Sequence, residues 1–208
     1  MARKLEWDRA LQNAAKSLSI KPSLIGYITK GMAFCGKQNV HDAGAAFDFA
    51  FTFANGDSKT TLLLFLIKAI ALFNANEHEA AMMRVKELAA GPSVDQVACL
   101  VVEAYLQVQL GTIAFNNKFY NEAVEIFIAA AKASKFFANL PIHTMYEEFT
   151  MLFGWDLKSL WQSANRHLCT VLLRTGKYAE GLELYLSMME VSDEATKAST
   201  RAWFAAFR

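Results

Sequence analysis

The 208-residue chain has only three prolines, three cysteines and almost no net charge. Because 21 basic side chains face 20 acidic ones, no overall field favours nucleic acid or an acidic membrane surface. The cysteines include no C-x-x-C pair, and an odd number fits reduced thiols better than a disulfide framework. We therefore expect a protein of the cytoplasm, with the nucleus as an alternative, that does not bind nucleic acid.

Long hydrophobic runs are also scarce. The longest, TLLLFLIKAIALF, has about half the length of a membrane span and contains Lys68. The first ten residues, MARKLEWDRA, lack the apolar stretch of a secretory signal. The sequence therefore predicts a buried helix at residues 61–73 and no membrane span.

Patterns that carry catalysis or bind metals are missing as well. The four histidines are never three or four residues apart, and neither H-E-x-x-H nor a glycine-rich phosphate loop occurs. Cys169 lies two residues after His167, a spacing that sends the two side chains to different faces of a helix. Glu147 and Glu148 diverge in the same way. We expect no metal, no cofactor and no enzymatic activity.

Apolar residues recur at intervals of three and four along most of the chain, which is typical of α-helices. Asn55-Gly56-Asp57 and Gly91-Pro92 mark helix ends, and Ser93 with Gln96 and Thr144 with Glu147 could form capping boxes. The sequence predicts an all-α fold of about eleven helices in a single domain, residues 1–208. The expected ranges are 5–20, 24–37, 40–54, 58–74, 77–90, 94–116, 120–134, 143–153, 157–175, 178–191 and 194–207.

Four segments are similar to one another, each with a small residue just after an acidic one. Two of them also carry an aromatic residue three positions before and another four positions after the small residue. The four small residues, named anchors below, are Ala43, Ala80, Ala123 and Gly181. Twelve positions before each anchor, on the preceding helix, come Gly31, Lys68, Gly111 and Cys169.

This pattern resembles the tetratricopeptide repeat (TPR) family, in which paired helices place a small residue on the first helix and Ala then an aromatic on the second. The best match runs from Gln109 to Ser134, with Gly111, Ala123 and Phe127 in register. Small residues let the helices of a pair approach closely. The resemblance implies an α-solenoid of antiparallel helix hairpins coiled into a right-handed superhelix.

The resemblance extends to both ends of the chain. Ala10 and Pro22 match the second helix and closing proline of a repeat, and Pro92 closes another one. Residues 194–207 match a first helix without its mate. With Leu5 and Trp7 at one end and Trp203 and Phe207 at the other, the ends lack polar caps. We therefore expect a piece of a longer repeat protein or a unit whose ends are covered.

We expect an insertion at residues 135–157, within the longest step between anchors, and it is rich in aromatic side chains. Two interpretations remain open. Aromatic residues at helical spacing are usually core, but they are also enriched at binding hot spots.

For function, the resemblance implies a non-catalytic scaffold or adaptor that binds a protein or peptide on a concave wall made by the first helices. The wall positions lie 18, 15, 11 and 8 residues before each anchor; they are mostly apolar and offer no cationic clamp for a carboxylate. Such a wall suits an amphipathic helix or an extended hydrophobic segment, unless the insertion or the C-terminal helix fills it. The alternative is a structural subunit that forms a homodimer through this groove or its terminal helices. The predicted wall residues are Ile28, Met32, Phe65, Leu72, Tyr105, Val108, Thr112, Phe115, Arg166 and Thr170.

Overall fold

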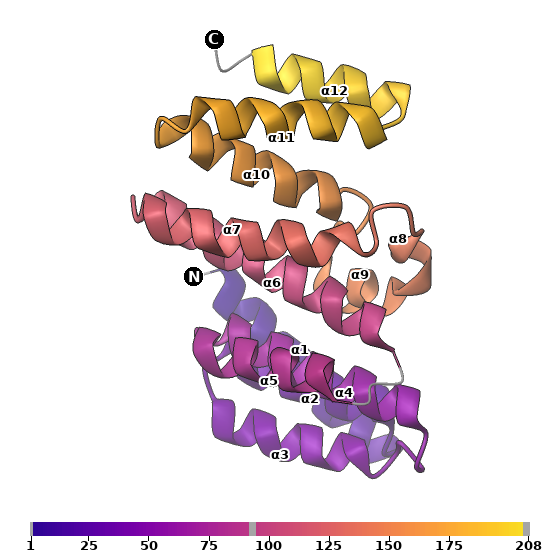
Figure 1. The fold of residues 1–208 in the computed structure, drawn as a ribbon. Coiled ribbons are helices and arrows are strands. Elements are labelled where there is room, and N and C mark those ends of the chain that lie inside the picture. Colours follow the sequence, from indigo (N-terminus) through magenta and orange to yellow (C-terminus); the bar gives the residue numbers. More distant parts are fainter. Residues whose placement is uncertain (1, 92–94, 206–208) are drawn as a thin grey trace. The chain divides into compact units, whose positions relative to one another are not determined.

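The computed structural model describes residues 2–91 and 95–205, with side chains from residue 6 onward. In this part of the chain every regular element is an α-helix, so the predicted all-α class is confirmed (Figure 1). The twelve helices are α1 (Ala2–Ile20), α2 (Leu24–Gly36), α3 (Val40–Phe51), α4 (Ser58–Asn74), α5 (His78–Ala90), α6 (Gln96–Asn116), α7 (Tyr120–Lys135), α8 (Ile142–Met145), α9 (Glu147–Phe153), α10 (Leu160–Arg174), α11 (Tyr178–Val191) and α12 (Glu194–Ala205).

The chain divides into two compact units, Met1–Leu106 and Gln107–Arg208. In the first unit α2 packs against α1, α3 and α4, and α4 also packs against α3 and α5. In the second unit α10 packs between α7 and α11, and α8 contacts α9. Each unit is therefore built from helices packed side by side, both neighbours along the chain and more distant ones.

The prediction of eleven helices is wrong by one, because the expected helix 143–153 is two short helices. The chain leaves helical geometry at Tyr146, where φ is −131° and ψ is 49°. Tyr146 at this break and Phe149 just after it are both buried, with ring centroids 6.1 Å apart. The predicted capping box of Thr144 with Glu147 does not form, since Thr144 lies inside α8 and its hydroxyl donates to the carbonyl of Pro141.

Several helix starts are fixed by side chains that accept backbone N–H groups, as expected for polar N-caps. Asp57 accepts from the hydroxyl of Thr60 at 2.5 Å and from its amide at 2.8 Å, and these bonds lower the pKa of the Asp57 carboxyl. Ser93 and Pro92, which were expected to cap and close helices, lie outside the described residues. Asp95 instead accepts from the amide of Ala98 at the start of α6.

Among the helices that the structure describes, α6 is the one whose length and composition would allow it to cross a membrane. Its most apolar 18-residue window has a mean hydropathy of 1.5, and 56% of that window is buried inside the protein. The core helix of a soluble protein passes the same test. The absence of a membrane span therefore stays a prediction.

Four helix pairs are joined by the same turn. In each, a residue with positive φ follows the first helix: Gln38, Asn76, Lys118 and Gly176. Its amide donates to the carbonyl three residues earlier at 2.8–3.2 Å, and the next amide donates to the carbonyl five residues earlier at 2.9–3.0 Å. These two bonds define a Schellman motif, which ends a helix with a left-handed residue. The four turns join α2 to α3, α4 to α5, α6 to α7 and α10 to α11.

The repeated turn fixes the anchor of each second helix, because the buried small residue always follows the left-handed residue by five positions. In three pairs this residue is the predicted one, Ala43, Ala123 or Gly181. In α5, however, it is Ala81, which is fully buried, whereas the predicted anchor Ala80 is half-buried. Counting from Ala81, the residue twelve positions earlier is the buried Ala69 instead of Lys68. The predicted register of this pair is therefore wrong by one residue.

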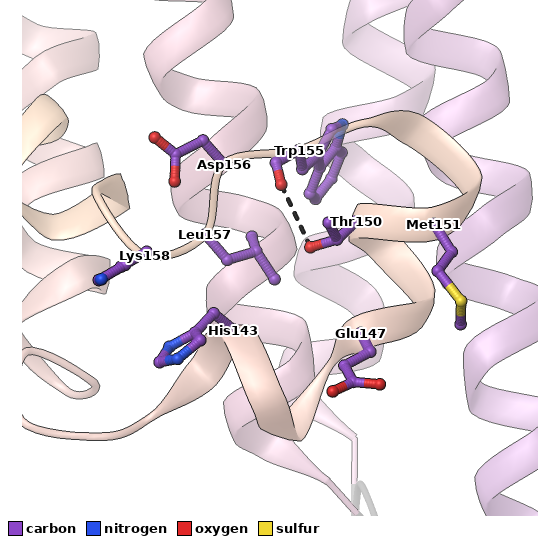
Figure 2. Close-up of a pocket in the computed structure, with 8 residues that line it drawn as sticks. All are labelled: His143, Glu147, Thr150, Met151, Trp155, Asp156, Leu157 and Lys158. Carbon is purple, nitrogen blue, oxygen red and sulfur yellow. Dashed lines mark hydrogen bonds between the residues drawn. The ribbon is translucent and has the colours of Figure 1, made fainter.

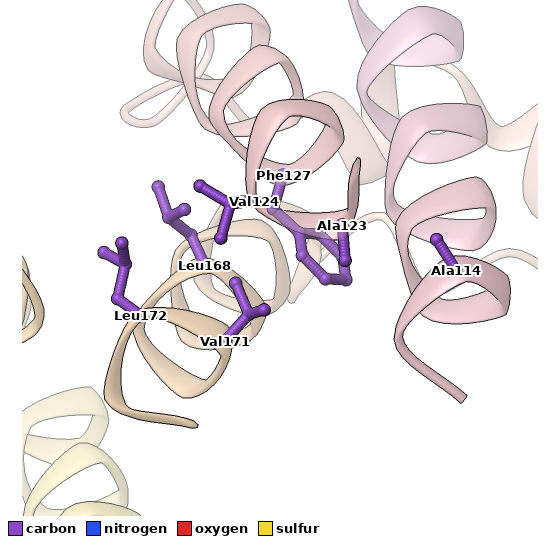
Figure 3. Close-up of a cluster of buried hydrophobic side chains, with 7 residues drawn as sticks. All are labelled: Ala114, Ala123, Val124, Phe127, Leu168, Val171 and Leu172. Atoms are coloured by element: carbon purple, nitrogen blue, oxygen red, sulfur yellow. The ribbon is translucent and has the colours of Figure 1, made fainter. Parts of the chain in front are cut away.

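Close helix contact is visible where glycine faces an aromatic ring. A methyl group added at Gly111 would lie 2.6 Å from the ring of Phe127, and one added at Gly31 would lie 2.6 Å from the ring of Phe47. Phe127 belongs to a buried cluster of α6, α7 and α10 (Figure 3). The other members of the cluster are Ala114, Ala123, Val124, Leu168, Val171 and Leu172. In both pairs, the glycine twelve positions before the anchor thus packs directly on the aromatic ring four positions after it.

The substitution Gly111→Ala is expected to lower the free energy of unfolding by about 1–2 kcal/mol, because its methyl group must displace the Phe127 ring. Gly44→Ala, also inside a helix, is the matched control, because no atom beyond its chain neighbours and its own helix backbone lies within 4 Å of the added carbon. It should stabilise the protein by about 0.5–1 kcal/mol through helix propensity. Urea unfolding followed by circular dichroism measures both, and equal effects would contradict the close packing.

Candidate protein-binding surface

In the first unit, the predicted wall residues differ in accessibility. Ile28 is buried, Met32 and Leu72 are half-buried, and Phe65 is 43% exposed. The Phe65 ring lies 4.7 Å from that of Phe51, so part of its surface is covered by α3. Only Phe65 of these four offers a large apolar area to a partner.

The one-residue shift in α5 changes which residues of α4 correspond to wall positions. Counted from Ala81, the positions 15 and 8 residues earlier are Leu66 and Phe73, and both are buried. Ile28 and Val108 occupy the same position, 15 residues before their anchors, and are buried as well. This position therefore belongs to the core in three helix pairs.

Two apolar side chains near the ends of α2 and α3 are accessible to a partner. Ile25 and Phe49 are both largely exposed. Tyr27 stacks on Phe49 with ring centroids 5.4 Å apart, and it lies 5.7 Å from Phe53. Sequence spacing predicts Ile25 at the wall, 18 residues before its anchor, whereas nothing in the spacing indicates Phe49.

On α6, the predicted wall residues mostly contribute to packing. Val108 is buried, and the Thr112 hydroxyl donates to its carbonyl at 2.7 Å. Phe115 is half-buried against the cluster of Figure 3 and meets Tyr120 edge-on at 5.4 Å. Tyr105 is half-buried. A substitution of Phe115 would therefore disturb the core as well as any binding surface.

On α10, the wall residue Arg166 is covered by α12. Its guanidinium donates to Ser199 at 2.9 Å and to Thr200 at 3.2 Å, and it lies 5.5 Å from the centre of the Trp203 ring. Burial lowers the pKa of Arg166. The Thr170 hydroxyl donates to the Arg166 carbonyl at 2.8 Å. At this position the chain itself occupies the predicted wall, through hydroxyl groups and an aromatic face. Phe207 and Leu5, which were also expected at the ends, lie outside the residues with described side chains.

The aromatic residues of the insertion divide between core and surface. Phe149 and Trp155 are buried, with ring centroids 5.5 Å apart, and Phe153 lies 5.6 Å from Trp155. The core interpretation therefore applies to these rings. Met151 is exposed, as are Phe136 and Met145 nearby.

The insertion also borders a shallow hollow of about 350 Å³ (Figure 2). The Thr150 hydroxyl donates to the Trp155 carbonyl across it at 3.2 Å. The Asp156 carboxylate accepts from Ser159, so it caps the following turn. Charges of both signs line the hollow, which favours no one class of ligand. Its lining residues are His143, Glu147, Thr150, Met151, Trp155, Asp156, Leu157 and Lys158.

Cys35, Cys169 and the half-buried His167 lie in packed surroundings. Burial raises the pKa of Cys35 and of Cys169 to about 11, so both thiols are protonated at neutral pH. The Cys169 thiol donates to the Gly181 carbonyl at 3.3 Å, and His167 stacks on Phe127 at 5.2 Å, where burial lowers its pKa. No group of three or more potential metal ligands occurs among residues 2–91 and 95–205.

Comparison of the chain with protein-family models, with curated proteins and with solved structures finds no match.

Proposed function

We propose that this chain is a non-catalytic protein-binding scaffold, built as a TPR-like right-handed solenoid of helix hairpins. The observation that carries the proposal is the repeated turn with its buried anchor, found twice in each unit. Identical turns at a constant distance from a buried small residue are what a repeat protein needs to stack equivalent hairpins. The chain would work in the cytoplasm or nucleus, where its free buried thiols stay reduced.

The binding surface that we propose, still named the wall, consists of the exposed apolar side chains on the first helices of the first unit; Phe65 belongs to it by its exposure, since it lies 16 residues before Ala81 and so at no counted wall position. Ile25 and Phe65 extend from the first helices of two hairpins and keep much of their surface exposed. Exposed apolar side chains of this kind hold an amphipathic helix or an extended hydrophobic segment of a partner. The alternation of a buried position with exposed neighbours explains how the same helices can serve both core and surface.

A peptide selection tests this function. Random segments of about 16 residues, a length suited to a helix of about four turns, are displayed on phage and selected on the wild-type protein. Enriched peptides are then titrated against the Ile25→Ser/Phe65→Ser variant. We expect the variant to bind these peptides roughly tenfold more weakly, because two apolar contact side chains are lost. Arg166, half-buried under α12, is left unchanged.

The matched control is Met83→Ser, which removes an exposed apolar side chain from α5, a second helix of the same unit. This variant should bind the enriched peptides as tightly as the wild type. Peptides that bind all three proteins equally would refute the proposed wall. Circular dichroism verifies that each variant is folded.

A further inference from the structure

Helix α11 carries another exposed apolar surface. It is the second helix of its hairpin, whereas the wall is formed by first helices. Tyr178, Leu182 and Leu186 are 68%, 47% and 53% exposed. They follow one another at intervals of four residues, so they lie on one face of the helix. We name these three residues the α11 stripe.

The α11 stripe is not simply the edge of an unfinished core, because α11 buries a different face. Gly181 and Met188 are buried, and Leu184 packs against the cluster of α6, α7 and α10. Tyr185 stacks on Phe204 of α12 with ring centroids 4.1 Å apart. The core contacts of α11 are thus made without the stripe.

The border of the stripe is acidic. Glu183 lies three residues before Leu186 and Glu190 four residues after it, so both side chains neighbour Leu186 on the helix surface. Both glutamates are exposed, and neither forms an ion pair within the part of the chain that the structure describes. The helix Tyr178–Val191 contains no Lys or Arg.

We propose that the α11 stripe binds an amphipathic helix of a partner protein, one whose apolar face is bordered by Lys or Arg. The apolar side chains of that helix cover Tyr178, Leu182 and Leu186, and its basic border meets Glu183 and Glu190. Complementary charge at the rim selects the partner and its orientation, while the buried apolar area supplies most of the affinity. An acidic border repels the phosphates of membranes and nucleic acids, so protein is the favoured partner. This surface is additional to the proposed wall, because it lies on a second helix.

Two synthetic helical peptides provide the probe. Both present leucines on one face, and the border positions are Lys in one peptide and Glu in the other. In fluorescence anisotropy at low salt, we expect the wild-type protein to bind the Lys peptide about tenfold more tightly than the Glu peptide. The Leu182→Ser/Leu186→Ser variant should bind the Lys peptide more weakly than the wild type, by a similar factor of about ten. Glu183→Lys/Glu190→Lys should reverse the preference between the peptides.

Met151→Ser is the control, because it removes an exposed apolar side chain of the same unit outside the stripe, and it should bind like the wild type. Equal affinity for the two peptides, or unchanged affinity in the serine double variant, would overturn the proposal. So would binding of the protein to phosphatidylserine vesicles, or self-association in sedimentation, that the serine double variant abolishes. Those results would make a membrane or a second copy the occupant.

Discussion

Replacing Phe127 by Ala is expected to lower the free energy of unfolding by about 3–5 kcal/mol. The ring is buried within the cluster of α6, α7 and α10 (Figure 3), faces Gly111 and stacks on His167. Its removal leaves a cavity that the neighbouring glycine has no side chain to fill. Urea unfolding, followed by circular dichroism, measures the loss.

The control is Ile128→Ala on the same helix, where the side chain is already 36% exposed, and its loss should be below about 1.5 kcal/mol. A double-mutant cycle adds a sharper test of the contact. The Gly111→Ala substitution should cost nothing, or stabilise, in the Phe127→Ala background, because the added methyl group enters the cavity. Additive losses would show that Gly111 and Phe127 do not pack together.

The helical class and most helix boundaries could be predicted from sequence, because they depend on local patterns. Intervals of three and four residues set the helices, and Asn55-Gly56 marks a turn whose φ angles are 49° and 77°. The pairing of Gly111 with Phe127 could also be predicted, since both positions belong to the repeat pattern. These features are set by residues close together in the chain.

The register of α5 could not be chosen from the acidic-small dipeptide, because Glu79 is followed by two alanines. The correct choice depends on contacts between helices, which bury Ala81 and leave Ala80 half-buried. A signal was nevertheless present. Taking Ala81 as the anchor replaces Lys68 by Ala69 and Arg84 by Val85 at the two packing positions, and both replacements are buried.

The break at Tyr146 and the exposure of the wall residues depend on tertiary packing. The periodicity of residues 143–153 continues through the break, so nothing local distinguishes one helix from two. Likewise, Arg166 looked like an accessible cation, but Ser199 and Thr200 of α12 bind it from 33 and 34 residues away. Such contacts decide which positions of a helix remain available to a partner.

The measurement that most directly tests the repeated hairpin register compares Ala81→Leu with Ala80→Leu. Ala81 is fully buried at the anchor position, so a leucine there adds three carbons to a packed seam and should cost about 3 kcal/mol of unfolding free energy. At the half-buried Ala80 the change should stay within about 0.5 kcal/mol. Urea unfolding of both variants, monitored by circular dichroism, measures the two losses of unfolding free energy. A larger loss for Ala80→Leu than for Ala81→Leu, or equal losses, would contradict the register and with it the equivalence of the four hairpins.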